Sequence, residues 1–207
     1  MNPHDLKKIL DDLHHQKLTP KQAMKKLATL PYENLGFAKV DHHRSLRIGM
    51  PEVIYCPGKT IFQIKKIIQS MNRAGHSVLA TKLSKDNFRK LKPSLPKFSE
   101  YNEMAQTLVI KKNKHRKKTG LITIISAGTS DIPIAEEASV TAQLLGSKIE
   151  TLFDVGIAGI HRLLDNLEQI HKARVVIVVA GMEGALASVV GGLVDKPIIA
   201  VPTSIGY

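Results

Sequence analysis

A polar loop separates an apolar run from a predicted helix in the stretch LITIISAGTSDIPIAEEA, residues 121–138. Its hydroxyl side chains can hydrogen-bond to an anion, and its glycine permits close approach of the backbone. The helix that follows offers unpaired N–H groups and the positive end of its dipole. The sequence therefore predicts a phosphate site, whose residues are Ser126, Gly128, Thr129, Ser130 and Asp131.

Polar or glycine-rich residues follow two later apolar runs in the same way. Asp154, His161 and Arg162 come after KIETLF, and a glycine-rich turn comes after RVVIVVA. The residues of that turn are Gly181, Met182, Glu183 and Gly184. Because ligands bind at the carboxyl ends of parallel strands, we expect one rim suited to a phosphorylated small molecule, with Arg162 completing the grip on the phosphate.

The elements that must position this rim alternate along residues 119–207. Apolar runs of strand length occur at 121–126, 148–156, 174–181 and 196–204, and helical segments at 132–146, 157–173 and 182–194. Continuously apolar runs are typical of strands that are covered on both faces of a parallel sheet. We therefore predict a three-layer α/β/α parallel sheet for this region.

A smaller α/β pattern precedes this region. Two helices are predicted within residues 5–30, and Pro20 suits the first turn of the second one. Strands are expected at 36–41, 52–56, 77–84 and 107–112, with a helix at 60–75. The predicted fold class is therefore α/β, with a small basic α/β domain and its two leading helices before the parallel sheet.

Charge divides the chain near residue 118. Residues 1–118 carry 25 Lys and Arg against 9 Asp and Glu, whereas residues 119–207 carry 5 against 9. We expect two domains with these bounds, joined by the lysine-rich stretch KKNKHRKK. That stretch is interpreted as a solvated linker, and a nucleic-acid or lipid patch is the alternative.

The basic region contains a loop suited to anions, DHHRSLRIG. Its guanidinium groups can grip a carboxylate or a phosphate in a forked geometry. A metal site and a plain surface loop are the alternatives. The candidate residues of this loop are Asp41, His42, Arg44 and Arg47.

A second loop, CPGKT, places Lys59 and Thr60 between a strand and a helix. It lacks the first glycine of a nucleotide-triphosphate loop, because Val53 stands at that position. The loop is therefore either an anion site at a helix N-terminus or a turn with a capping threonine.

Composition narrows the class of protein. The 207 residues are 43% hydrophobic, enough to bury a core. The single cysteine, Cys56, forms no internal disulfide, and its place between an apolar strand and Pro57 indicates a buried structural thiol. No apolar run reaches the roughly 18 residues of a membrane span, and the N-terminus lacks the apolar centre of a signal peptide. We expect a cytoplasmic protein that binds no membrane.

The second region resembles a known family in three motifs. SAGTSDIPIAEEA, the pair His161–Arg162, and VAGMEGALASVVGG followed by KPIIAVP are similar to motifs of the aminoimidazole ribonucleotide carboxylases and mutases, the PurE family. The resemblance implies that the first loop and the arginine bind a ribonucleotide phosphate. The sequence departs from that family at its catalytic histidine, because residues 185–188 are Ala-Leu-Ala-Ser.

A second resemblance covers both regions. Together with DHHRSLRIGMPEVIYCPGKT, these motifs resemble the LarB family, the carboxylase/hydrolase of nickel-pincer nucleotide biosynthesis that serves lactate racemase maturation. The resemblance implies that the substrate is nicotinic acid adenine dinucleotide or an NAD-like dinucleotide. Its pyridinium ring is carboxylated with carbon dioxide and its phosphoanhydride is hydrolysed. The products are pyridinium-3,5-biscarboxylic acid mononucleotide and AMP.

In that family a cysteine thiolate first adds to the electron-poor ring and makes it nucleophilic. This cysteine lies on a helix beyond the strand that here ends in VPTSIGY. We therefore expect residues 119–207 to lack the C-terminal end of the family's domain. Cys56 does not match the position of the nucleophile.

Roles are expected for the remaining residues. Glu183 is the candidate for acid/base chemistry or for a metal contact, and Asp154 is an auxiliary carboxylate. The substrate is expected to contact Ser126, Gly128, Thr129, Ser130, Asp131, His161, Arg162, Gly181, Met182, Gly184, Asp41, His42, Arg44, Arg47, Lys59 and Thr60. We expect no tightly bound cofactor. Carbon dioxide or bicarbonate is the co-substrate, and Mg²⁺ is a candidate ion for the hydrolysis, although no ligand motif is visible.

Two other functions stay open. A PurE-type carboxylase or mutase would account for the second region alone. A basic nucleic-acid-binding module would account for the first region, but aromatic residues are only 4% of the chain and no stacking motif is present, so a nucleic-acid partner is not expected. We expect a homo-oligomer, an octamer by the PurE resemblance.

Overall fold

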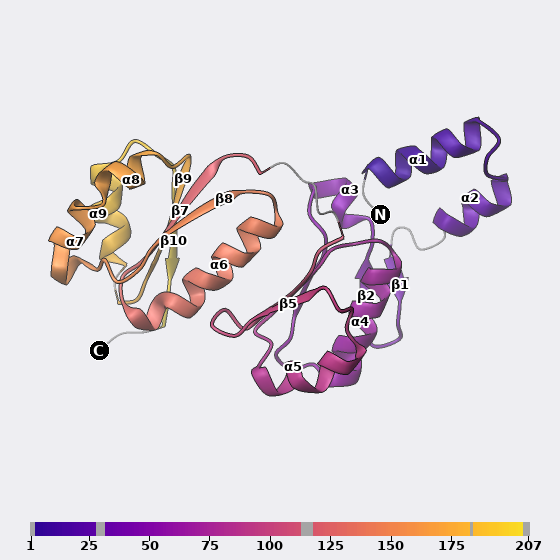
Figure 1. The fold of residues 1–207 in the computed structure, drawn as a ribbon, viewed down its shortest axis with the longest axis horizontal. Helices are drawn as coiled ribbons and strands as arrows, with labels where there is room; N and C mark the ends of the chain where they lie inside the picture. Colours follow the sequence, from indigo (N-terminus) through magenta and orange to yellow (C-terminus); the bar gives the residue numbers. More distant parts are fainter. Residues whose placement is uncertain (1–2, 28–31, 113–117, 183, 205–207) are drawn as a thin grey trace. The chain divides into compact units, whose positions relative to one another are not determined.

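The computed structural model describes residues 3–27, 32–112, 118–182 and 184–204 (Figure 1). The chain divides into two compact units. The N-terminal unit comprises Met1–Tyr101 and Leu108–Lys114, and the C-terminal unit comprises Asn102–Thr107 and His115–Tyr207. The core of the C-terminal unit lies on both faces of its sheet, and the N-terminal unit has a separate core.

The N-terminal unit begins with two helices, α1 (Pro3–His14) and α2 (Pro20–Leu27), which contact each other. Thr19 caps the second helix: its N–H donates to Gln22 Oε1 at 2.8 Å, and its hydroxyl accepts the N–H of Gln22 at 3.3 Å. The two predicted leading helices are therefore present.

A mixed four-stranded sheet follows, in the order β3 (Val53–Tyr55), β4 (Val78–Thr81), β6 (Thr107–Ile110) and β5 (Ser99–Asn102). Strands β3 and β4 are parallel and are joined by α4 (Ile61–Arg73), whereas β4 and β6 are antiparallel. The apolar stripe of α4, including Ile64, Ile68 and Met71, packs into the core of this unit. Helix α5 (Lys85–Leu91) and the short turn η1 (Lys92–Ser94) lie between β4 and β5.

Two local predictions for this unit are right only in part. The predicted strand 36–41 is part of a hairpin of β1 (Tyr32–Asn34) and β2 (Lys39–Asp41), because Gly36 turns the chain with φ +85°. The basic stretch DHHRSLRIG is not a loop throughout, because it contains the short helix α3 (Arg44–Ile48). That helix ends at Gly49, whose φ of +76° suits the left-handed cap that glycine adopts most readily.

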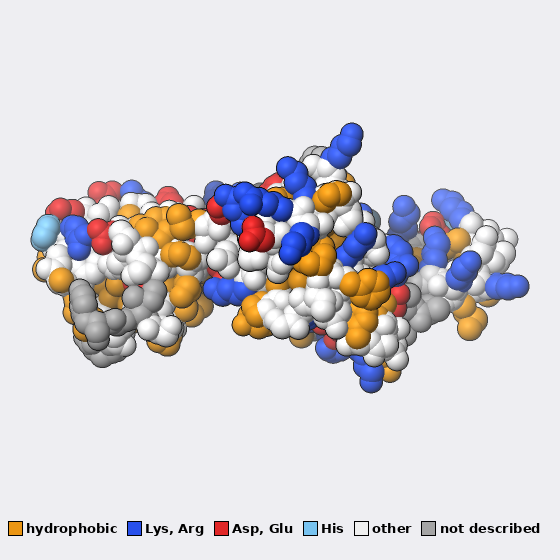
Figure 2. Space-filling model, turned by 90° about the horizontal axis from the view of Figure 1, so that it is seen from below, with side chains coloured by type: hydrophobic (Ala, Val, Ile, Leu, Met, Phe, Trp, Pro, Cys, Tyr) orange, Lys and Arg blue, Asp and Glu red, His pale blue; other side chains and the backbone are white. Residues whose placement is uncertain are grey.

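Basic side chains are widespread on the N-terminal unit. Figure 2 shows one face of the molecule, on which Lys and Arg side chains lie scattered over this unit among apolar and neutral ones. On the face drawn in Figure 2, Lys and Arg side chains are dense on this unit and sparse on the C-terminal unit, in line with the charge division of the sequence.

The C-terminal unit is built on a parallel sheet in the order β10 (Ile198–Pro202), β9 (Val175–Ala180), β7 (Leu121–Ser126) and β8 (Lys148–Leu152). All three strand pairs are parallel. Helices α6 (Ile132–Leu144), α7 (Ile160–Leu164), α8 (Leu167–His171) and α9 (Ala185–Leu193) complete it.

Alternate residues of these strands face opposite helical layers. Ile124 and Val179 lie in one cluster with Ala135 of α6. Ile125 and Val178 lie in the other, with residues of α7, α8 and α9 (Figure 1). The predicted three-layer α/β/α arrangement is confirmed.

One predicted helix of this unit is broken into pieces. The segment 157–173 forms the turn η3 (Ile157–Gly159) and the two short helices α7 and α8. Asn166 ends the continuity, because its side-chain amide donates to the carbonyl of Arg162 at 2.8 Å while its own φ is −108°. Asparagine commonly competes with a helix by such local hydrogen bonds.

The strand order creates a switch point between β7 and β9. The chain passes from β7 to β8 on one side and returns to β9 on the other side of β7. The register pairs Ser126 with Val179, so both strands end at the same edge of the sheet. Ligands of open α/β sheets bind at such a point.

No helix in the described part of the chain is both long enough and apolar enough to cross a membrane.

Candidate functional site

The loops at the carboxyl edge of the parallel sheet are joined by backbone hydrogen bonds. The N–H of Ala127 donates to the carbonyl of Val179 at 2.9 Å, and the N–H of Thr203 donates to that of Ala180 at 2.9 Å. The loops that follow β7, β9 and β10 are therefore fixed to one another at the switch point.

Asp131 holds the loop after β7 in shape. Its carboxylate accepts the N–H of Gly128 at 3.0 Å with Oδ2 and the hydroxyl of Thr203 at 2.8 Å with Oδ1. Only 4% of the residue is exposed. We infer that Asp131 shapes the loop through these contacts.

Ser126 also has an internal partner. It is fully buried, and its hydroxyl accepts the N–H of Asp154 at 3.2 Å. Thr129 and Ser130 are exposed, and they form the short turn η2 (Thr129–Asp131) immediately before α6. Within the predicted phosphate loop, these two residues are the ones that present hydroxyl groups at the surface of the unit.

The turn after β8 packs closely against the loop after β7. A Cβ at Gly156 would lie 2.7 Å from the carbonyl oxygen of Ala127, so only glycine fits there. Arg162 donates to Asp154 Oδ2 at 2.6 Å, and both side chains are partly exposed. Arg162 lies on α7, and His161 of the same helix is exposed.

The glycine-rich turn after β9 begins with Gly181, whose carbonyl accepts the N–H of Gly184 at 3.1 Å. Met182 and Gly184 both have left-handed backbones, with φ of +51° and +70°, and Met182 is 60% exposed. Glu183, the predicted acid/base residue, lies outside the described residues. Helix α9 then begins at Ala185.

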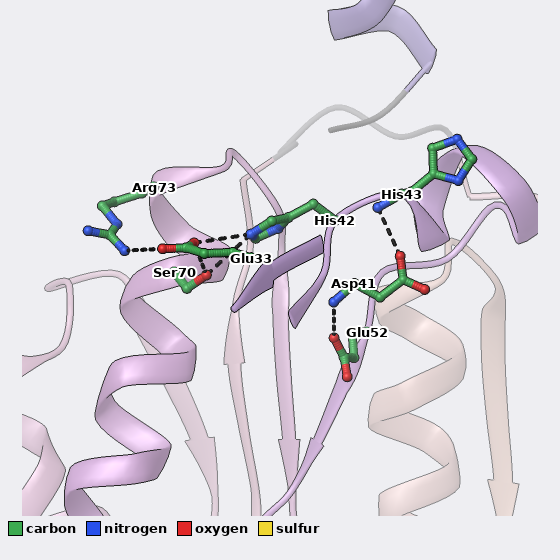
Figure 3. Close-up of polar contacts among 7 residues, drawn as sticks. All are labelled: Glu33, Asp41, His42, His43, Glu52, Ser70 and Arg73. Atoms are coloured by element: carbon green, nitrogen blue, oxygen red, sulfur yellow. Dashed lines mark hydrogen bonds and ion pairs between the residues drawn. The ribbon is translucent and has the colours of Figure 1, made fainter. Parts of the chain in front are cut away.

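The residues predicted in the basic loop form two different groups (Figure 3). Asp41 accepts from Arg47 at 2.9 Å and from the N–H of His43 at 3.0 Å. Burial raises the pKa of Asp41, but the Arg47 guanidinium and the backbone N–H groups of His43 and Arg44 together outweigh that effect, so the net pKa is lowered. Arg44 lies in the first turn of α3. Asp41 and Arg47 are thus paired with each other.

His42 lies in a buried polar network that the sequence did not reveal (Figure 3). Its Nε2 is 3.3 Å from Glu33 Oε2 and 3.2 Å from Ser70 Oγ, and the residue is 1% exposed. The Ser70 hydroxyl donates to Glu33 at 2.5 Å, and Arg73 donates to the other oxygen of Glu33 at 3.0 Å. The Ser70 hydrogen bond is the main cause that lowers the pKa of Glu33.

This network ties the β1–β2 hairpin to α4. It is not arranged as a hydrolytic triad, because the serine and the carboxylate both approach the same imidazole nitrogen. No spacing pattern in the sequence predicts this network, because its members lie up to 40 residues apart in the chain. The role of His42 in binding substrate stays a prediction.

The histidines of this unit predict a pH dependence of stability. The rings of His42 and His76 stack with centroids 5.2 Å apart, and burial lowers the pKa of His42 and that of His76, the latter to about 4. The unfolded chain therefore binds the proton more strongly. The stabilisation by the neutral histidines is complete above pH 6.5, the ordinary pKa of histidine, and it is lost as the pH falls toward 4. We expect the free energy of unfolding to be about 2 kcal/mol lower near pH 5 than at neutral pH.

Tyrosine fluorescence during urea unfolding measures this effect, because the chain has no tryptophan and Tyr32, Tyr55 and Tyr101 belong to the N-terminal unit. His76→Phe should remove most of the acid sensitivity, whereas His15→Gln, at an exposed position, should not. An unfolding midpoint that does not change with pH in the native protein would contradict the assignment.

Lys59 and Thr60 have local partners. The Thr60 hydroxyl accepts the N–H of Gln63 at 3.2 Å, and the Gln63 side chain accepts the N–H of Thr60 at 2.9 Å. This reciprocal pair is a capping box at the start of α4. Lys59 Nζ donates to the carbonyl of Tyr55 at 2.7 Å. Thr60 is therefore a helix cap, and a role of the loop in binding an anion stays a prediction.

Cys56 is a buried thiol, as predicted. It is 3% exposed, and burial raises its pKa to about 11. We expect native protein at about pH 8 to be alkylated at Cys56 at least about tenfold more slowly than protein in urea, because the thiolate is the reactive form. Mass spectrometry of the Cys56 peptide measures this. Equal rates in the two states would show that the thiol is accessible.

No group of three or more His, Cys, Asp or Glu side chains within the described ranges is placed to hold a metal ion. The residues that the structure does bring together are those at the carboxyl edge of the parallel sheet. We call this edge the switch-point rim, and its residues are Gly128, Thr129, Ser130, Asp131, Asp154, Gly156, Arg162, Gly181, Met182, Gly184 and Thr203.

Comparisons with known proteins match the two regions separately. Residues 32–113 match the LarB/PurE-like N-terminal domain, and residues 121–206 match the AIR carboxylase family. The two matches thus define a carboxylase-related protein with a PurE-like C-terminal domain. The order of the two matches is that of LarB proteins, and the chain belongs to the LarB family.

Two similar proteins come from Methanocaldococcus jannaschii. The uncharacterized protein MJ0165 is 45% identical over 178 residues, which cover 82% of this chain and 69% of that protein. An N5-carboxyaminoimidazole ribonucleotide mutase is 39% identical over 85 residues, which cover 40% of this chain and 52% of the mutase.

Proposed function

We propose that this protein carboxylates the pyridinium ring of nicotinic acid adenine dinucleotide and hydrolyses its phosphoanhydride. Carboxylation replaces a ring C–H by C–COO⁻ and releases a proton. Hydrolysis consumes one water and separates AMP from the mononucleotide. The products are AMP and pyridinium-3,5-biscarboxylic acid mononucleotide, a precursor for the nickel-pincer cofactor of lactate racemase.

The observation that supports this proposal most is the convergence at the switch-point rim. The exposed hydroxyls of Thr129 and Ser130 stand at the start of α6, and the Arg162 guanidinium lies at the neighbouring turn. A helix N-terminus, hydroxyl groups and an arginine together suit a phosphate group. The glycine-rich turn at the end of β9 is suited to the carboxylate or carbon dioxide, through its backbone N–H groups.

Each candidate residue has a proposed part in this scheme. Glu183 is the acid/base residue. Arg162, Thr129, Ser130 and the N-terminus of α6 hold the phosphate, and the turn that includes Gly181 and Gly184 holds the group being transferred. The thiolate step has no assigned residue, because Cys56 is buried and its pKa is raised. Carbon dioxide or bicarbonate is the proposed co-substrate, and Mg²⁺ is proposed for the hydrolysis. The proposed assembly is a homo-oligomer in the cytoplasm.

Incubation of the protein, produced with the helix on which the family's nucleophilic cysteine lies, with the dinucleotide and labelled bicarbonate tests this function. We expect label in a pyridine mononucleotide, together with release of AMP. Folded protein that yields neither product would overturn the proposal. Label without AMP, or AMP without label, would overturn one half of it.

A second candidate is the mutase reaction of the PurE family. The identity to an N5-carboxyaminoimidazole ribonucleotide mutase over 85 residues favours it. Residues 185–188, Ala-Leu-Ala-Ser, oppose it, because the family's catalytic histidine is expected there. Turnover of N5-carboxyaminoimidazole ribonucleotide by the same protein sample, measured by absorbance, would favour the mutase over the dinucleotide carboxylase.

A further inference from the structure

The turn after β8 brings a carboxylate and a guanidinium together at the switch-point rim. Arg162 donates to Asp154 Oδ2 at 2.6 Å, a length typical of a strong charge-assisted hydrogen bond. The two side chains are 39% and 49% exposed. A guanidinium has five N–H donors, and its contact with Asp154 uses one of them, so the fork can also meet a bound anion.

Two features fix the position of Asp154, its backbone conformation and a hydrogen bond of its N–H. Its backbone has φ +59°, in the left-handed region that few residues other than glycine adopt. Its N–H donates to the buried hydroxyl of Ser126 at 3.2 Å. Strained backbone that the surroundings maintain is frequent at functional sites. The conformation aims the carboxylate of Asp154 at Arg162.

Gly159 supplies the third constraint on the arginine. A Cβ at Gly159 would lie 2.6 Å from Arg162 Nε and 3.1 Å from its Cζ. The guanidinium therefore lies close over Gly159, and a side chain at this position would force the guanidinium to shift. Ser126 of β7, Asp154 of the β8 turn and Gly159 of η3 together fix one guanidinium group at the rim.

We propose that Asp154 is a positioning residue for the phosphate-binding Arg162, and not an acid/base group of the reaction. Its carboxylate orients the guanidinium so that the remaining N–H groups meet the phosphate of the nucleotide. This inference rests on the proposed function, because it takes the ligand to be a nucleotide phosphate. It changes the role expected for Asp154 from the sequence.

A double-mutant cycle on the full chain tests the proposal, with nicotinic acid mononucleotide and inorganic phosphate as probes in titration calorimetry. We expect Asp154→Ala to weaken binding of both about tenfold and Arg162→Ala to weaken it at least as much. The double variant should bind no more weakly than Arg162→Ala, because Asp154 acts through the arginine. Asp154→Asn, which keeps an acceptor oxygen, should recover part of the loss.

Glu168→Ala is the matched control, because it removes another exposed carboxylate paired with a lysine, on α8 of the same unit. It should leave binding unchanged. Thermal unfolding of every variant reports whether the fold is kept, and a variant that fails to fold is replaced by Asp154→Asn in the cycle.

The outcomes separate this inference from the proposed function. Additive losses in the double variant, or an Asp154→Ala protein that binds as the native protein does, would overturn the positioning role alone. Asp154→Asn that binds normally but loses turnover would overturn it too, since that result marks an acid/base group. Native protein that binds neither probe would overturn the positioning role and the proposed function together.

Discussion

Arg162→Ala is expected to lower kcat/KM for the dinucleotide about a hundredfold while the protein remains folded. The side chain is partly exposed at the switch-point rim, and its forked donors match the oxygens of a phosphate. Its removal takes away that contact without opening the core, because neighbouring Leu163 carries the buried position of α7. The measurement is steady-state kinetics with labelled bicarbonate, together with a thermal melt.

Two further variants sharpen this test. Arg162→Lys keeps the positive charge but loses the planar fork, so we expect an intermediate loss. Lys172→Ala removes an exposed cation at the C-cap of α8 that pairs with Glu168 and should change nothing. An Arg162→Ala protein with activity within about twofold of the native value would show that the arginine does not hold the substrate.

Asp131→Ala is expected to lower the free energy of unfolding of the C-terminal unit by about 2–3 kcal/mol and to weaken nucleotide binding. The carboxylate is 4% exposed and joins the N–H of Gly128 to the hydroxyl of Thr203. Without it, a partly buried N–H and a partly buried hydroxyl lose their partner, and the loop that carries Thr129 and Ser130 loses its support. Urea unfolding followed by far-UV circular dichroism measures the change.

Smaller changes at the same contacts give graded controls. Thr203→Val removes one of the two hydrogen bonds and should cost about 1 kcal/mol. Asp131→Asn keeps the acceptor oxygens only in part and should lie between the native protein and Asp131→Ala. If Asp131→Ala has the same urea midpoint as the native protein but no longer binds the nucleotide, the carboxylate contacts the ligand directly and the shaping role is wrong.

The C-terminal sheet could be predicted from the sequence because its strands are continuous apolar runs that end in polar or glycine-rich loops. Burial on both faces leaves such runs little choice of structure. The run RVVIVVAG thus predicts both β9 and the turn that follows it, and the structure has the strand at Val175–Ala180. The edge at which the loops meet followed from the same pattern.

The particular contacts at this edge could not be predicted, because they depend on residues that are distant in the chain. Asp131 is bonded to Thr203, 72 residues away, and Ser126 is bonded to Asp154, 28 residues away. The sequence shows that Ser126 and Asp131 are polar and belong to the predicted loop. It does not show that their side chains are turned inward.

The N-terminal unit was harder to predict for a related reason. The stretch DHHRSLRIG is short and lacks an apolar period, so helix α3 left no signal. His42 was predicted as an anion-binding residue of a basic loop, but it is buried and contacts Glu33 and Ser70. Polar residues are buried where tertiary contacts satisfy them, and local patterns do not carry that information.

A crystal structure of the full chain with nicotinic acid mononucleotide tests the central claim most directly. The claim predicts the phosphate of the mononucleotide within hydrogen-bonding distance of Ser130, in the turn η2 just before α6, and of the Arg162 guanidinium. A mononucleotide bound away from the switch-point rim, or a phosphate held there by neither group, would contradict it.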